Sequence, residues 1–215
     1  FKKTEPNAHG TKTSAAPVNP FKVNDDSPKL PAHKAAEFHD LVAKTLFATK
    51  RARPDACTAI AFLTARVRGP DKDDWAKMVH VMKHVRGTHK LPLILSANGS
   101  GILKWWIDSS FAAHPNLRGH SGGGLSLGRG FPFVGSTKQK LNSRSSTETE
   151  VIGVDDFMPA TCWTRCFMEA QGHKVNDNAL LQDNKSAVLL EKNGKMSSRK
   201  RTKHVNVRHF FITDR

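Results

Sequence analysis

Apolar residues recur at helical spacing over the first half of the chain, between Pro31 and Gly87. This spacing predicts a helical segment. Proline cannot continue a helix, so the pairs Arg53-Pro54 and Gly69-Pro70 should divide the segment into three short helices. Residues 1–34 hold scattered prolines and polar residues with little periodicity, which predicts a disordered linker.

A different pattern begins after Gly99. The run Ile102–Asp108 is β-rich and apolar on both faces, as a central strand is. After it we expect two glycine-punctuated strands, a long helix that begins at capping-box residues, a strand, a short helix and a last ordered segment. These elements fall at residues 121–128, 131–135, 145–172, 179–183, 186–190 and 204–212. Their order predicts an α/β fold.

Composition adds a preference for polyanionic partners. The 215 residues include 34 basic and 19 acidic side chains, a net charge of +15, well above the magnitude of roughly 2 to 8 that keeps a small domain soluble. No run approaches the roughly 20 apolar residues that cross a bilayer, and three cysteines do not form a disulfide framework. We therefore expect an intracellular protein with no membrane partner. The chain opens on Phe1 without an initiator methionine, which suggests a fragment of a longer translated region.

Three acidic residues occupy unusual places in this pattern. Asp108 ends the first strand, Glu150 lies in the first turns of the long helix, and Asp183 closes the later apolar strand. A single carboxylate at such a place is most often a cap or a solvated strand end. Three that converge would repel one another without a cation, and hard oxygen ligands suit Mg²⁺ or Mn²⁺. Such ions support phosphodiester hydrolysis, so the combination indicates a metal site.

Five short motifs, in this order, resemble the ribonuclease H segment of copia-type LTR retrotransposon polyproteins. They are WIDSSFA at 106–112, STKQK at 136–140, SSTETE at 145–150, QDNKSA at 182–187 and RTKHVNVR at 201–208. The helical stretch from about Phe38 through Thr88 resembles the end of the reverse transcriptase region that precedes this segment. The resemblance covers about residues 35 to 215.

This resemblance implies an α/β fold of the ribonuclease H type, with a mixed five-stranded sheet and flanking helices, preceded by a small helical segment. It implies a helical tail of the reverse transcriptase at 35–97 and a ribonuclease H-like domain at 98–215. The implied activity is two-metal cleavage of the RNA strand of an RNA/DNA hybrid, with the reverse transcriptase domain of the same polyprotein as partner. The implied location is a cytoplasmic retrotransposon particle, with the nucleus as a further option. The chain has no Tyr, so the Tyr-x-Asp-Asp turn of the polymerase is missing and DNA synthesis is not expected.

By motif position, Asp108 matches the first catalytic Asp of the family, Glu150 the catalytic Glu, and Asp183 the Asp that follows the fourth strand. All three would be metal ligands. Glu148 is the alternative to Glu150 and is better suited to capping the helix. The family's fourth carboxylate lies on a helix further downstream, so we expect a domain truncated before that helix at Arg215.

Nucleic-acid contacts are expected from two groups of residues. The segment from Lys185 to Arg215 carries net charge +7 and would follow phosphates without reading sequence, although a solvated loop or a nuclear-import signal explains it equally well. Its candidate phosphate contacts are Arg199, Lys200, Arg201, Lys203 and Arg208. Ser109, Ser110 and Asn184 adjoin the carboxylates and are candidates for contacts to 2′-hydroxyl groups.

Other readings stay open. Cys162 and Cys166 have the spacing of half a zinc site, but no second ligand pair accompanies them, so apolar buried thiols are preferred. His114 and His120 flank the loop after Asp108 and are expected at the surface or at the edge of the core. Besides a ribonuclease H enzyme, the chain could be a catalytically inactive nucleic-acid-binding remnant. It could also be a structural connector, which would require the three carboxylates to lie far apart.

Overall fold

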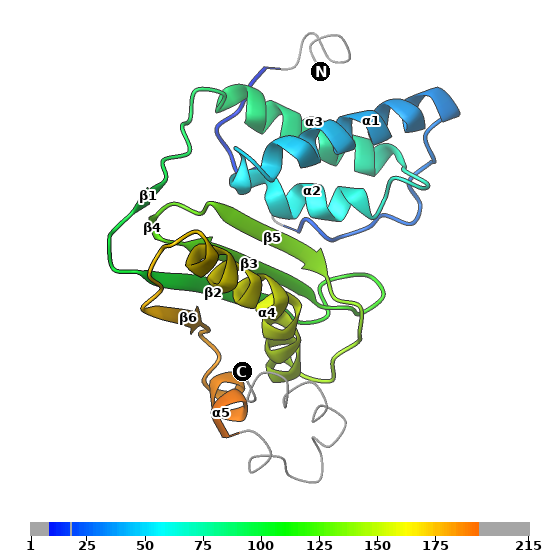
Figure 1. The fold of residues 1–215 in the computed structure, drawn as a ribbon. Coiled ribbons are helices and arrows are strands. Elements are labelled where there is room, and N and C mark those ends of the chain that lie inside the picture. Colours follow the sequence, from blue (N-terminus) through cyan, green and yellow to red (C-terminus); the bar gives the residue numbers. More distant parts are fainter. Residues whose placement is uncertain (1–8, 18, 194–215) are drawn as a thin grey trace. The chain divides into compact units, whose positions relative to one another are not determined.

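The computed structural model describes residues 9–17 and 19–193, which form two compact units that divide between Ile94 and Leu95 (Figure 1). The first unit is helical and the second holds a mixed sheet with flanking helices. This agrees with the predicted α/β class. The division lies three residues before the boundary expected from the sequence.

The first unit contains the three predicted helices. They are α1 (Ala32–Thr49), α2 (Cys57–Thr64) and α3 (Lys72–Gly87), with a short 3-10 helix, η1 (Pro54–Ala56), before α2. Helix α3 begins at a capping box, in which the Asp71 carboxylate accepts from the Asp74 N–H at 2.9 Å and the Asp74 carboxylate accepts from the Asp71 N–H at 3.1 Å. Two capped donors at the first turn fix the start of α3 directly after Pro70.

The segment predicted as a linker is mostly part of this unit. Ala15 is 1% exposed, and Phe21, Val23 and Leu30 pack against the buried side chains of the helices. The expectation of a disordered linker is therefore wrong for these described residues, which form an N-terminal arm on the helices. The sequence did not indicate this because four isolated apolar residues in an irregular segment have no periodicity.

The second unit is built on a four-stranded sheet of order β5-β3-β2-β6. Its strands are β2 (Ile102–Ser110), β3 (His120–Ser126), β5 (Phe133–Lys138) and β6 (Asp177–Leu181), and a separate two-stranded ladder joins β1 (Ser96–Ala97) to β4 (Gly128–Arg129). Strands β2, β3 and β5 form an antiparallel meander, and β6 runs parallel to β2. The described residues thus hold four strands of this sheet rather than the expected five. The segment expected at 204–212 lies outside them.

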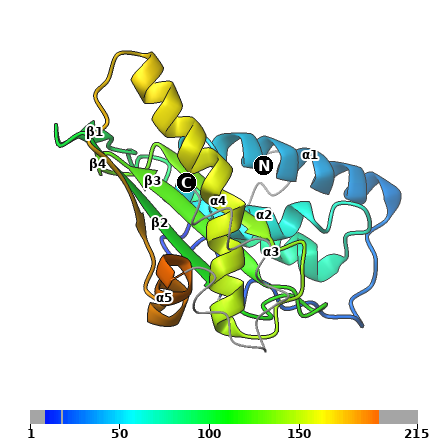
Figure 2. The same cartoon turned by 60° about the horizontal axis from the view of Figure 1, so that its bottom comes forward.

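Helix α4 (Ser146–Ala170) lies across one face of this sheet, and α5 (Lys185–Asn193) lies beside the first half of α4 (Figures 1 and 2). Close approach requires glycine at the contact: a Cβ on Gly153 of α4 would lie 2.1 Å from the Ser109 Oγ of β2. Helix α4 changes direction along its length in Figure 2, and Pro159, which has no N–H to donate, accounts for a bend.

The two faces of strand β2 differ in burial. Leu103, Trp105 and Ile107 are buried beneath α4, with Trp105 completely inaccessible. Trp106 points to the opposite face and is 50% exposed, so the expectation of a central strand with two apolar faces in the core is wrong for this side of β2.

Candidate metal centre

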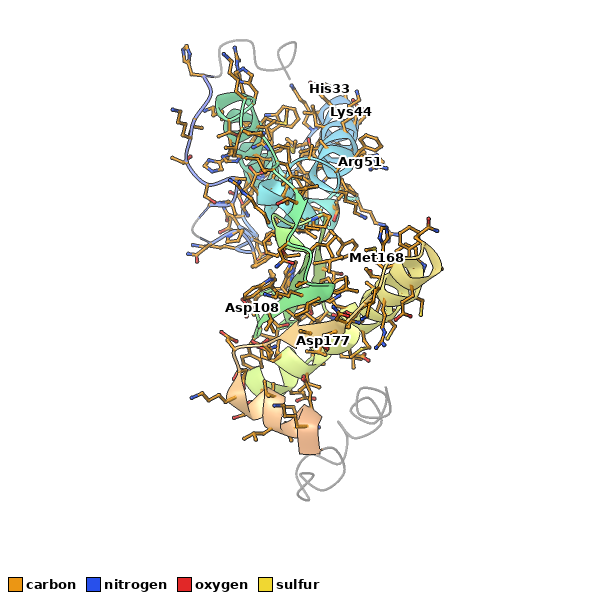
Figure 3. The ribbon with its side chains drawn as sticks, turned by 60° about the vertical axis from the view of Figure 1, so that its left-hand side comes forward. His33, Lys44, Arg51, Asp108, Met168 and Asp177 are labelled. Atoms are coloured by element: carbon orange, nitrogen blue, oxygen red, sulfur yellow. The ribbon has the colours of Figure 1, made fainter. Side chains whose placement is uncertain are left out.

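Asp108 stands on β2 on the opposite face of the strand from the buried Ile107, near the end of the strand (Figure 3). Its side chain is exposed. The Asp108 Oδ1 accepts from the Ser109 backbone N–H at 2.9 Å. The strand therefore presents a solvated carboxylate beside the start of α4.

Glu150 is placed by the first turns of α4. Ser145 caps the helix by accepting from the Glu148 N–H at 3.2 Å, and the Glu148 carboxylate accepts from the Arg144 N–H at 2.7 Å. Glu148 therefore takes part in capping the start of α4, the role for which the sequence favoured it. Glu150 is buried, with 6% of its surface exposed, and its carboxylate lies close to that of Asp108.

A buried glutamine holds this helix start to the sheet. Gln139 is fully buried, and its Nε2 donates to the Ser121 Oγ of β3 and to the Thr149 carbonyl of α4, both at 2.9 Å. Ser121 in turn donates to Asp156 of α4 at 2.8 Å. Gln139 belongs to one of the five motifs, and the structure gives this motif a structural role that spacing alone did not reveal.

Asp183 follows β6 in a short turn before α5, and its side chain is exposed. The next residue, Asn184, caps α5, because its Oδ1 accepts from the Ala187 N–H at 3.1 Å. Asn184 is one of the candidates for contacts to nucleic acid, and its Oδ1 already has this partner within the protein. The cap also fixes the turn that carries Asp183.

The three predicted carboxylates meet at this edge of the sheet. One oxygen from each of Asp108, Glu150 and Asp183 lies within 4.8 Å of the others. The pKa of Glu150 is raised to about 7: burial is the largest cause and the charges of Asp108 and Asp183 add to it, whereas hydrogen bonds from Gln182 and from the Ser109 backbone oppose it. The arrangement opposes ionisation unless a positive charge is present, and its three hard oxygen donors suit a divalent cation.

A further carboxyl group lies close by on α5. Burial, together with the negative charge of Glu150, raises the pKa of Glu191 to about 7. The Glu191 Oε1 is buried and has no hydrogen-bond partner among the described residues. In the sequence, Glu191 stands out only as an acidic residue within the basic segment from Lys185 to Arg215. Its signal would have been its place on the helix that directly follows Asp183.

Other candidates are placed differently from the expectation. The Ser109 Oγ is buried against Gly153 and has no hydrogen-bond partner within residues 9–17 and 19–193. The Ser109 side chain faces α4 rather than the side of the strand that carries Asp108, and its contact to nucleic acid stays a prediction. Ser110 is exposed. The basic candidates Arg199, Lys200, Arg201, Lys203 and Arg208 lie outside the described residues.

The two histidines after Asp108 form a buried pair. The His114 Nε2 and the His120 Nδ1 are 3.0 Å apart, and the His120 Nε2 lies 2.6 Å from the Ser136 Oγ. Burial lowers the pKa of each ring to about 4. The pair is neutral at neutral pH and belongs to the packing of the β3–β5 hairpin.

The two cysteines of α4 do not share one environment. Cys162 packs against the core, but Cys166 is exposed, so the expectation of two buried thiols is wrong for Cys166. In the part of the chain that the structure describes, no third ligand joins them in a metal-binding group.

None of the described helices combines the length and the apolarity that crossing a membrane requires.

The sequence is 26% identical over 178 residues to the retrovirus-related Pol polyprotein from transposon TNT 1-94 of Nicotiana tabacum. The match covers 82% of this chain and 13% of the relative, so the chain spans a small part of that polyprotein. No protein-family model and no solved structure matches the chain. The similarity supports an origin in a retrotransposon Pol polyprotein.

Proposed function

We propose that the second unit is the ribonuclease H segment of a retrotransposon Pol polyprotein and hydrolyses the RNA strand of RNA/DNA hybrids. The observation that carries the proposal is the meeting of Asp108, Glu150 and Asp183 within 4.8 Å. These residues come from a strand, a helix start and a second strand end that are far apart in the sequence. The structural-connector alternative required them to lie apart and is therefore disfavoured.

The fold supports the same reading. An antiparallel meander is followed by a helix on one face and by a strand parallel to the first, giving the mixed sheet that the resemblance implies. The Pol polyprotein relative supports it independently. The polyprotein origin also supplies the expected partner, a reverse transcriptase domain, and we assign the helical unit before Leu95 to the end of that region.

The donor set fits Mg²⁺ or Mn²⁺, since all three groups offer carboxylate oxygens and nothing in the cluster is a soft ligand. Asp108, Glu150 and Asp183 would hold the ion. When bound, it would activate a water molecule and stabilise the leaving oxygen of the phosphodiester.

The three carboxylates differ in exposure, and we assign them different roles accordingly. Asp108 and Asp183 are exposed, so a phosphate group can approach them from solvent. Glu150 is buried and accepts a hydrogen bond from Gln182, which fixes the position of its carboxylate on the buried side of the site. The net charge of +15 favours the approach of a polyanionic hybrid independently of sequence.

Cleavage of a hybrid with labelled RNA tests the proposal. The wild-type chain should nick the RNA strand with Mg²⁺ or Mn²⁺ and not with chelator. Asp183→Asn should lower the rate at least ~100-fold, because it removes a charged ligand while keeping the shape of the side chain. The matched control is Asp177→Asn, an exposed Asp at the opposite end of β6 (Figure 3), which should cleave at the wild-type rate.

Two results would contradict the proposal. Cleavage by Asp183→Asn in excess chelator would point to a contaminating or metal-independent nuclease. Tight hybrid binding without cleavage by the wild-type chain in either metal would instead favour the inactive nucleic-acid-binding remnant.

A further inference from the structure

The Gln182 side chain joins two elements of the candidate metal centre. Its Nε2 donates to the Glu150 Oε2 at 3.0 Å, and its Oε1 accepts from the Asn184 backbone N–H at 3.1 Å. The first partner lies on α4 and the second lies in the turn after β6. Gln182 and Asn184 flank Asp183, so one side chain connects the turn that carries Asp183 to the buried carboxylate.

The chemistry of both partners fixes the orientation of this amide. The Asn184 backbone N–H can only donate, so the Gln182 oxygen must face Asn184 and its nitrogen must face Glu150, whose ionised carboxylate accepts. If the amide were rotated by 180°, both hydrogen bonds would be lost. The bridge therefore depends on a group that donates at one atom and accepts at the other.

The hydrogen bond from Gln182 to Glu150 opposes the electrostatic repulsion among the three carboxylates. Glu150 is buried beside two other carboxylates, and burial and like charge both favour moving its ionised form away. A Lys or Arg at position 182 could also hold Glu150, but its positive charge would compete with a cation. A neutral amide holds the carboxylate and leaves the charge of the cluster available to a metal.

We propose that Gln182 is a positioning residue that keeps Glu150 and the turn of Asp183 at ligating separation before a cation binds. The inference rests on the proposed function, because it assumes that the three carboxylates take up a divalent ion. It adds that the site is preorganised by a residue that touches neither metal nor substrate. Preorganisation should appear as tighter binding of the ion, since less of the binding energy is lost in assembling the ligands.

Calorimetric titration of the full chain with Mn²⁺ tests the inference. Gln182→Met keeps the length of the side chain but removes both hydrogen bonds, and we expect its dissociation constant to rise about tenfold. Gln171→Met is the matched control: this exposed residue caps the far end of α4, and the variant should bind Mn²⁺ as the wild type does. Saturating Mn²⁺ should restore the cleavage rate of Gln182→Met to within about twofold of wild type.

A structural role alone would give another result. If Gln182 only supported the fold, Gln182→Met would lower the melting temperature and leave the Mn²⁺ dissociation constant unchanged, which would overturn the inference. Asp108→Asn separates this outcome from failure of the site itself. If the wild type and Asp108→Asn bind Mn²⁺ equally, the metal centre is wrong. If only Asp108→Asn loses binding, the centre stands and the role of Gln182 is wrong.

A measurement on the wild-type protein does not depend on whether Gln182→Met folds. The Asn184 N–H and the Gln182 side-chain amide should be protected from hydrogen exchange in the metal-free protein, because their hydrogen bonds are already formed. Protection that appears only after Mg²⁺ is added would mean that the bridge follows binding, and the proposal would fail.

Discussion

Among single residues, Glu191 is the acidic group whose burial the sequence did not indicate. Its Oε1 is buried with no hydrogen-bond partner in the described part of the chain, and burial together with Glu150 raises its pKa to about 7. The folded state thus retains a proton that the unfolded chain, in which this carboxyl has its ordinary pKa of 4.5, releases at lower pH. Its contribution to stability is complete below pH 4.5 and is lost as the pH rises to about 7.

We therefore predict that Glu191→Gln stabilises the metal-free protein at pH 8 and has little effect at pH 4.5. The gain at pH 8 should be roughly 1 to 2 kcal/mol, a discounted value because Glu191 is partly exposed. Urea unfolding followed by tryptophan fluorescence, in a Trp75→Phe background that silences the first unit, measures the difference. A gain of the same size at both pH values would contradict the assigned ionisation.

Some residues of the site could be predicted from sequence and others could not. Asp108, Glu150 and Asp183 were predictable because strand ends and a helix start meet at one edge of a sheet. The inward direction of Ser109 and the bridge of Gln182 depend on how closely α4 approaches the sheet. That distance is set by packing contacts that leave no periodic signal in the sequence.

At the scale of elements, Gly153 decides how closely α4 approaches β2. A Cβ at this position would lie 2.1 Å from the Ser109 Oγ and 3.4 Å from the Ser109 Cβ. Because Glu150 is one helical turn before Gly153, any displacement of the helix also moves the carboxylate. The packing of this contact and the geometry of the metal centre are therefore coupled.

Gly153→Ala should destabilise the second unit by roughly 1 to 3 kcal/mol, even though alanine favours helix by up to about 1 kcal/mol. Ser109→Ala should be nearly neutral alone, because it removes a buried hydroxyl that has no partner among the described residues. In the double variant Ser109→Ala should recover at least half of the loss, as measured by a double-mutant cycle in urea. Simple additivity of the two changes would show that Ser109 does not limit the approach of α4.

At the scale of the whole molecule, the sequence predicted the elements better than their assembly. The three helices of the first unit and the order of strands and helices along the second unit follow from hydrophobic spacing and from proline and glycine positions. The packing of the N-terminal arm did not follow, because Ala15 and Phe21 are isolated apolar residues in an irregular segment. The predicted role of the basic cluster from Arg199 to Arg208 stays a prediction, since it lies outside the described residues.

The central claim is that Asp108, Glu150 and Asp183 together hold a divalent cation. Anomalous diffraction from crystals of the full chain grown with Mn²⁺ tests it most directly, because it locates the ion independently of any activity. We predict a manganese peak within ligating distance, roughly 2.0 to 2.3 Å, of oxygens from all three carboxylates. The absence of a peak there at millimolar Mn²⁺, or a peak bound only by other residues, would contradict the account.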